Sequence, residues 1–389
     1  MPMRVKFTRL MFDDLHLQPN SRYHRGVRGG RMDNLSLAVT DNSTLLPGGG
    51  DTAARAPYGG KTLFAAVLVG TFLGIITLGT IIGNVLVCLA AVVNRRLRSI
   101  TNYFVVSLAV ADLLVGVLVL PFSTIFEVTR YWNFGLILCN LWVSLDVLCS
   151  TASILNLFAI SLDRYYAITR PFTYSNKMCR RKAFMAIAVV WIVSLLVSFL
   201  PIWVGWNTGD GRLQNIDDPT QCSFNNTNVY YIMIVAFGTY YIPLIIMCIT
   251  YFRIFLIAKE QANRINALQP EVRDANRRQN QNLANEHKAT RTLAAVLGAF
   301  IICWTPYFTV FTITPLCGCT IPDQLYSVVL WLGYINSLLN PCVYAFMNKE
   351  FRRAFKKLLC FQTNSVCCCN NLRNGGLDTP THSTAHRHS

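Results

Sequence analysis

Three acidic residues lie inside long apolar stretches of the sequence, where an ionised carboxylate is costly. They are Asp112, Asp146 and Asp163. Because a charge in such a segment needs a partner to offset its desolvation, each is a candidate for function. Their surroundings differ, so each indicates a different chemistry.

Asp146 is the candidate for binding a cation. Cys139 begins the third apolar stretch, at the end that the charge pattern described below places outside the cell. Asp146 lies seven residues further along, about 10 Å deeper if the stretch is helical. An ammonium ion would pair with it, and aromatic rings favour a cation over their faces by about 0.5–2 kcal/mol each. The candidate aromatic residues are Trp142, Trp304, Tyr307, Phe308 and Tyr334. The alternative is a structural Asp bonded to neighbouring hydroxyls.

Asp112 is the candidate for a polar centre deep in the molecule. Its expected neighbours from other segments are Asn84, Ser153, Asn336 and Asn340. One carboxylate with several neutral oxygens suits a hydrated Na⁺ better than a transition metal. A polar network that holds the helices together is the alternative, and the two are compatible. No other cofactor or metal is expected.

A latch is predicted where Asp163 is followed by Arg164 and Tyr165, with Glu286 at the same level of a later segment. Arg164 held by Asp163 and Glu286 would close one face of the molecule.

Two prolines mark positions where helices can bend. Pro306 follows Trp304, and Pro341 stands between Asn340 and Tyr344. A proline removes a backbone hydrogen bond, so the helix can hinge there. A cation site, a latch and two hinges together indicate a switch.

The composition determines the setting of these residues. Of 389 residues, 53% are hydrophobic and 14% are charged, against roughly 25% charged in a soluble domain. The mean hydropathy is +0.37. A soluble enzyme, a disordered chain and a collagen-like fibre are excluded. Stretches long enough to span a bilayer are expected at 63–93, 102–125, 136–163, 183–205, 229–255, 291–314 and 326–347.

Basic residues concentrate in alternate connections, as at Arg95, Arg96 and Arg98 after the first stretch. Cytoplasmic loops carry such an excess, so the N-terminus is expected outside and the C-terminus inside. The net charge of +16 is therefore a topology signal, and no nucleic-acid partner is expected. The polar connection between the fifth and sixth stretches is expected to be flexible.

Cysteines and sequons on the outer side predict covalent features. Cys139 and Cys222 face an oxidising compartment, and a disulfide between them is predicted. Cys317 and Cys319 form either a tight local bridge or two free thiols. Glycosylation is predicted at Asn34, Asn42 and Asn225. Met32 is an alternative start of translation.

The segment after the last stretch is predicted to lie on the membrane. Phe351 and Phe355 share one side of a helix, opposite Arg352 and Lys356, which is typical of an interfacial helix in contact with lipid. Cys360 is a palmitoylation candidate, with a zinc site as the rival interpretation. Ser and Thr residues in the tail are candidate sites for kinases and arrestin. The expected domains are a tail over 1–61, a membrane domain over 62–347, and the helix and tail over 348–389.

Together these motifs resemble the rhodopsin-like family of G-protein-coupled receptors over about 62–360. The resemblance implies an all-α bundle of seven transmembrane helices with a short eighth helix, a plasma-membrane location, and a heterotrimeric G protein as partner. Asp146 with Tyr334 resembles the signature of the amine receptors, in which the Asp pairs with the ligand ammonium. Several stretches resemble histamine type-2 receptors, and others resemble serotonin type-4 receptors. Both imply coupling to Gs and a rise in cyclic AMP.

One departure concerns the fifth span. Histamine type-2 receptors carry an Asp there, one turn before a Thr that corresponds to Thr239; the Asp position is Val235. Catecholamine receptors use serines, where this chain has Val235 and Ala236. A single hydroxyl at Thr239 suits an amine with one polar group, such as an indole or phenol amine.

Other classes fit less well. A retinal photoreceptor needs a lysine in the seventh span, where Tyr334 stands. A channel or transporter would show rings of charge or paired broken helices. An enzyme would need a nucleophile with a base, and none of the expected spans contains a histidine. A receptor that signals without an amine is the remaining rival.

Overall fold

The computed structural model describes residues 60–217, 220–224, 227–267 and 277–361. Seven of its helical segments are long and apolar enough to cross a membrane, in agreement with the predicted number. These spans, numbered first to seventh below, are Leu63–Val93, Ile100–Thr129, Gly135–Thr169, Arg180–Val204, Val229–Gln261, Arg291–Cys317 and Asp323–Met347. All regular structure in the described ranges is helical.

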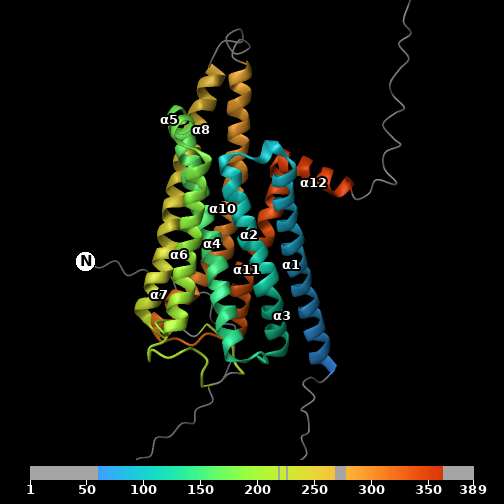
Figure 1. The fold of residues 1–389 in the computed structure, drawn as a ribbon, viewed down its shortest axis with the longest axis vertical. Helices are drawn as coiled ribbons and strands as arrows, with labels where there is room; N and C mark the ends of the chain where they lie inside the picture. Colours follow the sequence, from blue (N-terminus) through green and yellow to red (C-terminus); the bar gives the residue numbers. More distant parts are fainter. Residues whose placement is uncertain (1–59, 218–219, 225–226, 268–276, 362–389) are drawn as a thin grey trace, which may run out of the picture. The chain divides into compact units, whose positions relative to one another are not determined.

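The helices run roughly side by side as one bundle (Figure 1). In chain order they are α1 (Gly60–Val93), η1 (Arg95–Leu97), α2 (Ile100–Leu114), η2 (Val115–Val119), α3 (Leu120–Thr129), α4 (Gly135–Thr169), α5 (Pro171–Lys177), α6 (Arg180–Val204), α7 (Val229–Val235), η3 (Ala236–Tyr241), α8 (Ile242–Ala267), α10 (Arg277–Cys317), α11 (Asp323–Met347) and α12 (Lys349–Phe361). The short helix α12 leaves the bundle sideways at the end where α5 lies, as an interfacial helix would.

Two of the spans contain a π-helical turn that the sequence patterns did not reveal. Segment η2 separates α2 from α3, and η3 separates α7 from α8. A proline follows each of them, Pro121 and Pro243, and proline cannot donate the backbone hydrogen bond of a regular helix. The wider turn rotates all later side chains of the span relative to a regular helix.

The connection between the fifth and sixth spans is more helical than expected. α8 continues to Ala267, and α10 begins at Arg277. The described part of this connection is thus helical, and its flexibility stays a prediction. Polar residues over this range retain helical propensity and extend both helices beyond the apolar spans.

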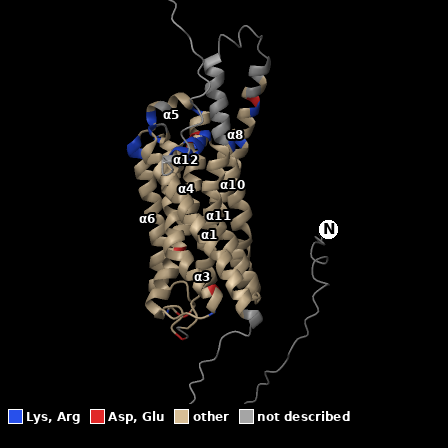
Figure 2. Ribbon diagram, turned by 90° about the vertical axis from the view of Figure 1, so that its right-hand side faces the viewer, with Lys and Arg blue, Asp and Glu red and all other residues tan. Residues whose placement is uncertain are grey.

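Charge and burial agree with a membrane location. Lys and Arg gather at the end of the bundle that carries α5 and α12, which is the predicted cytoplasmic end (Figure 2). Large apolar side chains face outward along the spans, as Phe72 and Ile245 do, whereas Asn84, Asp112 and Asn156 are fully buried inside. Apolar outer faces around a polar interior are what a bundle in lipid requires.

Candidate ligand-binding site

A cavity of about 740 Å³ opens at the predicted outer end of the bundle. Its size lies within the usual range for small-molecule sites. The second, third, fifth, sixth and seventh spans and the outer loop before α7 contribute to its wall. All residues that the sequence predicted for ligand binding line it, namely Asp146, Val235, Thr239, Trp304, Tyr307, Phe308 and Tyr334.

Asp146 presents its carboxylate to this cavity from α4. Tyr334 on α11 donates its phenol proton to Asp146 Oδ2 at 2.7 Å, and Ser150, one turn further along α4, donates to Oδ1 at 3.4 Å. Neither partner carries a positive charge. The carboxylate is therefore oriented by two hydroxyls but not neutralised by them, as a site for a cation requires.

Aromatic side chains form the wall beside Asp146. Trp304 packs against Tyr307 and Phe308, with ring centroids 5.8 Å apart in both pairs. Phe311 continues this row and stacks on Phe224 of the outer loop at 6.2 Å. Sequence analysis missed Phe224 and Phe311, although Phe224 lies only two residues from the predicted disulfide.

The predicted disulfide joins Cys139 at the start of α4 to Cys222 in the outer loop, with Cα atoms 5.7 Å apart. It holds the loop over the cavity, which explains why Gln221, Cys222 and Ser223 line the cavity. A second disulfide joins Cys317 to Cys319, the first of the two alternatives above. Among the free cysteines of the spans, Cys149 and Cys303 are buried and Cys88 is partly buried, whereas Cys248 in α8 is exposed.

The fifth-span side of the cavity is mostly apolar. Val235 lines it, and the hydroxyl of Thr239 donates to the Val235 carbonyl at 2.7 Å within the same helix. Tyr240 is fully buried and shares a hydrogen bond with Thr305 at 2.6 Å, so it braces the fifth span against the sixth. A polar ligand group would find only the lone pairs of Thr239 here.

The polar centre around Asp112 exists, with one member that the sequence did not indicate. Ser153 and Ser337 donate to Asp112 Oδ1 at 3.2 and 2.8 Å, and Asn340 donates to Oδ2 at 2.8 Å. Asn84 does not bond Asp112; its amide donates to the Ser337 carbonyl at 3.0 Å, so it supports α11 instead.

Asn336, which was also expected in this centre, differs in another way. It is buried, but neither polar atom of its amide has a hydrogen-bond partner among the described residues. The backbone of α11 directs Ser337, the next residue along, towards Asp112, and Ser337 takes the place expected for Asn336.

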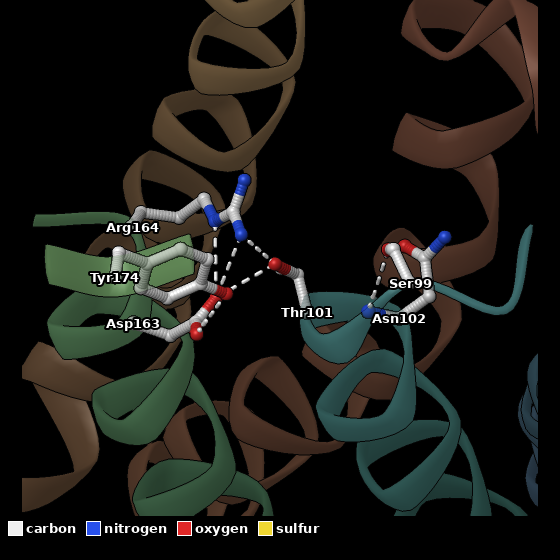
Figure 3. Close-up of polar contacts among 6 residues, drawn as sticks. All are labelled: Ser99, Thr101, Asn102, Asp163, Arg164 and Tyr174. Atoms are coloured by element: carbon white, nitrogen blue, oxygen red, sulfur yellow. Dashed lines mark hydrogen bonds and ion pairs between the residues drawn. The ribbon is translucent and has the colours of Figure 1, made fainter. Parts of the chain in front are cut away.

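At the inner end, Arg164 is held by α4 itself and by the second span (Figure 3). Its guanidinium contacts Asp163 Oδ2 at 2.8 Å and also donates to the Thr101 hydroxyl. Thr101 in turn donates to Asp163 at 2.6 Å, and Tyr174 of α5 donates to the other carboxylate oxygen at 2.8 Å. Burial, assisted by the charge of Asp163, raises the pKa of Tyr174 to about 12, so the phenol keeps the proton that it donates.

Thr101 and Tyr174 were not predicted, although both complete the cluster around Arg164. The side chain of Glu286, the other half of the predicted latch, lies outside the described residues, as do the side chain of Cys360 and the sequons at Asn34, Asn42 and Asn225. Tyr165 is half-buried on the same helix as Arg164. Pro306 and Pro341 lie inside α10 and α11, where hinges were predicted.

Tyr344 lies near the inner end of the seventh span. Its ring stacks on Phe351 of α12 at 5.3 Å, and both residues are buried. Together with Arg164 and Thr101 they line a second cavity of about 570 Å³ at the inner end of the bundle. The two cavities lie at opposite ends of the bundle and share the second, third, sixth and seventh spans.

The fold and the two cavities define a class of protein. The family model described as "7 transmembrane receptor (rhodopsin family)" matches residues 83–344. The chain belongs to this family. It is therefore a multi-pass plasma-membrane receptor that acts through a G protein, and not an enzyme.

Individual relatives narrow the class. The histamine H2 receptor of Cavia porcellus is 49% identical over 295 residues, which are 76% of this chain and 80% of that receptor. The human histamine H2 receptor is 46% identical over the same shares. The D(1C) dopamine receptor of Xenopus laevis is 40% identical over 344 residues, 82% of this chain and 73% of that receptor. The chain is a member of the biogenic-amine group with an overall sequence like that of the histamine H2 receptors, and the likeness to serotonin type-4 receptors stays a prediction.

Proposed function

We propose that the receptor is switched by an amine whose ammonium group pairs with Asp146, and that the switch raises cyclic AMP through Gs. The observation that carries the proposal is the Asp146 carboxylate, which lines the outer cavity and is oriented by Tyr334 and Ser150 without a positive partner. The ligand ammonium supplies that partner, and the rings of Trp304 and Phe308 surround its substituents.

The charge pair is tested by Asp146→Asn. Removing one partner of a largely desolvated pair costs about 3–5 kcal/mol, so amine potency falls by about two to four orders of magnitude. Cyclic AMP is measured in cells that express the full chain, with surface expression matched. Asp210→Asn is the control, because Asp210 is exposed on the outer loop. Equal potency in Asp146→Asn and the unchanged receptor would support the rival receptor that signals without an amine.

The identity of the amine is a separate part of the proposal. The overall likeness to receptors named for histamine favours histamine, whereas the apolar Val235 favours an indole or phenol amine with one polar group. Val235→Asp places a carboxylate one turn before Thr239, so histamine potency rises relative to tryptamine and tyramine. If histamine is already the most potent amine on the unchanged receptor and Val235→Asp does not improve it, another group holds the imidazole.

The inner half of the switch follows from the cluster around Arg164. We propose that ligand binding shifts the population towards a state in which α10 swings at Pro306 and Arg164 leaves Asp163 for the G protein. Glu286→Gln is expected to raise basal cyclic AMP if Glu286 is the other half of the latch. Arrestin and receptor kinases are proposed to act on the tail that follows α12.

An allosteric Na⁺ is proposed at Asp112. The donor set around Asp112 fits a hard cation: one carboxylate and the hydroxyls of Ser153 and Ser337, all of them oxygen ligands. Through Asp112, these residues link the second span to the third and seventh spans. Agonist affinity is expected to fall as NaCl replaces KCl at constant ionic strength, and Asp112→Asn is expected to remove that dependence.

A further inference from the structure

The outer cavity has a second acidic region at its mouth. Glu127 of α3 and Asp323 of α11 line it together with Asp146, and Arg130 is the basic residue that lines it with them. Among the described residues of the cavity wall, three carboxylates therefore face one guanidinium. A ligand with a single ammonium at Asp146 would leave one carboxylate without a counter-charge.

The two acidic regions lie at different depths. Glu127 is in the last turn of α3, whereas Asp146 lies about 16 Å of helix rise after Gly135, the first residue of α4. The short connection 130–134 places the end of α3 and the start of α4 at a similar level. Asp146 is thus on the order of 10 Å deeper than Glu127. One ammonium group cannot contact both carboxylates.

The ion pair between Arg130 and Glu127 can be replaced by other contacts of both side chains. The Arg130 guanidinium pairs with Glu127 and also donates to the Ser327 hydroxyl of α11 at 3.3 Å. The Arg130 side chain is 50% exposed and that of Glu127 16%, so the guanidinium end of the pair is open to solvent, which screens the attraction between the two charges. Asp323 lies one helical turn before Ser327, so a second carboxylate is close to the present anchor of the guanidinium.

The side of the cavity formed by the fifth and sixth spans offers few groups that could bind a second polar group of the ligand. Val235 and Phe308 line it, and the Thr239 proton is already donated to a backbone carbonyl. The side of the cavity formed by α3 and α11 carries the charges instead. A second polar group of the ligand would therefore be bound by residues of the second and seventh spans rather than by the fifth span.

The geometry points to a specific ligand class. We propose that the receptor recognises elongated dicationic amines, in which one ammonium pairs with Asp146 and a second cation, at the other end of the ligand, pairs with Glu127 while Arg130 moves to Asp323. All three carboxylates are then paired. This inference rests on the proposed function, since it needs the amine site at Asp146.

The test compares ligands that differ by one charge. The purified full-length receptor is titrated with α,ω-diaminoalkanes of four to ten carbons and with n-alkylamines of the same lengths, and affinities are obtained from thermal stabilisation against ligand concentration. At one chain length the diamine is expected to bind at least about tenfold more tightly than the matched monoamine. This readout does not depend on G-protein coupling.

Variants assign the effect to the mouth of the cavity. Glu127→Gln is expected to abolish the higher affinity of the diamine and to leave the affinity for the n-alkylamine unchanged. Arg130→Ala is expected to increase the difference in affinity, because the Arg130 guanidinium no longer competes with the ligand for Glu127. Glu350→Gln is the matched control, since Glu350 pairs with Arg353 at the same spacing at the other end of the bundle.

The outcomes separate the two proposals. If monoamines bind and diamines bind no better at any length, or if Glu127→Gln weakens both equally, the inference is overturned and the proposed function stands. If no amine of either series stabilises the receptor, the amine site at Asp146 fails, and the inference fails with it.

Discussion

Thr101 shows how much one side chain contributes at the inner end of the bundle. Its hydroxyl donates to Asp163 and accepts from Arg164, so it connects the second span to both charged residues of the third (Figure 3). Neither its type nor its position among apolar neighbours marks it in the sequence. Tyr334, by contrast, was a candidate from the sequence, and its contact with Asp146 spans 188 positions of the chain.

Thr101→Val is predicted to raise basal signalling. The substitution keeps the shape of the side chain but removes two hydrogen bonds, which costs about 1 kcal/mol and frees Arg164 to leave Asp163 about fivefold more often. Basal cyclic AMP and thermal stability are measured together.

Ser99→Ala is the control for this prediction. The Ser99 hydroxyl caps the N-terminus of α2 by accepting from the backbone N–H of Asn102 at 3.4 Å, and it lies apart from Arg164 in Figure 3. Its loss is expected to lower stability by about 1 kcal/mol without a change in basal signalling. Equal basal activity in both variants would show that the effect is one of stability alone.

At the scale of the helices, close approaches and covalent ties determine the cavity. α10 and α11 come so near each other at Gly333 that an added Cβ would lie 3.0 Å from the Trp304 ring. The π-helical turns η2 and η3 set the rotation of the second and fifth spans where they line the cavity. The disulfide then fastens the outer loop above it.

Gly333→Ala is predicted to disturb the cavity through the packing of these two helices. A large ring cannot yield as a flexible side chain does, so overpacking is expected to cost about 1–3 kcal/mol and to weaken amine binding. Gly298→Ala in α10 is the matched control, because an added Cβ there meets nothing within 4 Å. The substitution also replaces glycine, a poor helix former, with alanine. The prediction is tested by measuring the thermal stability and the amine affinity of both purified variants. An unchanged amine affinity in Gly333→Ala would contradict it.

The two disulfides are predicted to differ in importance. The link between Cys139 and Cys222 closes a separation of 83 residues, whereas Cys317 and Cys319 are separated by 2. Stabilisation through the unfolded chain grows with loop length and is about 4 kcal/mol for a free chain of the larger size. Cys222→Ser should therefore lower the melting temperature and amine affinity more than Cys319→Ser does. The reverse order would mean that the short bridge holds the mouth of the cavity.

At the scale of the whole molecule, charge distribution determines orientation. The basic residues gather at the end with α5 and α12 (Figure 2). The residues that line the ligand cavity belong to the other end of the spans. Because basic loops are retained in the cytoplasm, the amine site is expected to face outward.

The predicted orientation is tested with epitope tags. A tag before residue 1 should be reached by antibody on intact cells, and a tag after residue 389 only after permeabilisation. Asn34→Gln, Asn42→Gln and Asn225→Gln together should abolish the mobility shift caused by glycosidase if these sequons are used. A C-terminal tag accessible on intact cells would reverse the orientation and, with it, the assignment of both cavities.

The sequence alone was sufficient for properties that depend on neighbouring residues. Apolar length determines the seven spans, basic loops predict their direction, and acidic residues inside apolar stretches mark Asp112, Asp146 and Asp163. Interfacial character over 349–361 is likewise visible from helical periodicity, because each of these signals lies within one element.

Only the tertiary structure decided which side chains meet. Ser337 rather than Asn336 reaches Asp112, and Arg130 extends from the end of α3 to α11. Such contacts depend on the rotation and bending of whole helices. A π-helical turn or a proline shifts that rotation for every residue beyond it, and a pattern read along one segment does not contain the position of the segment opposite.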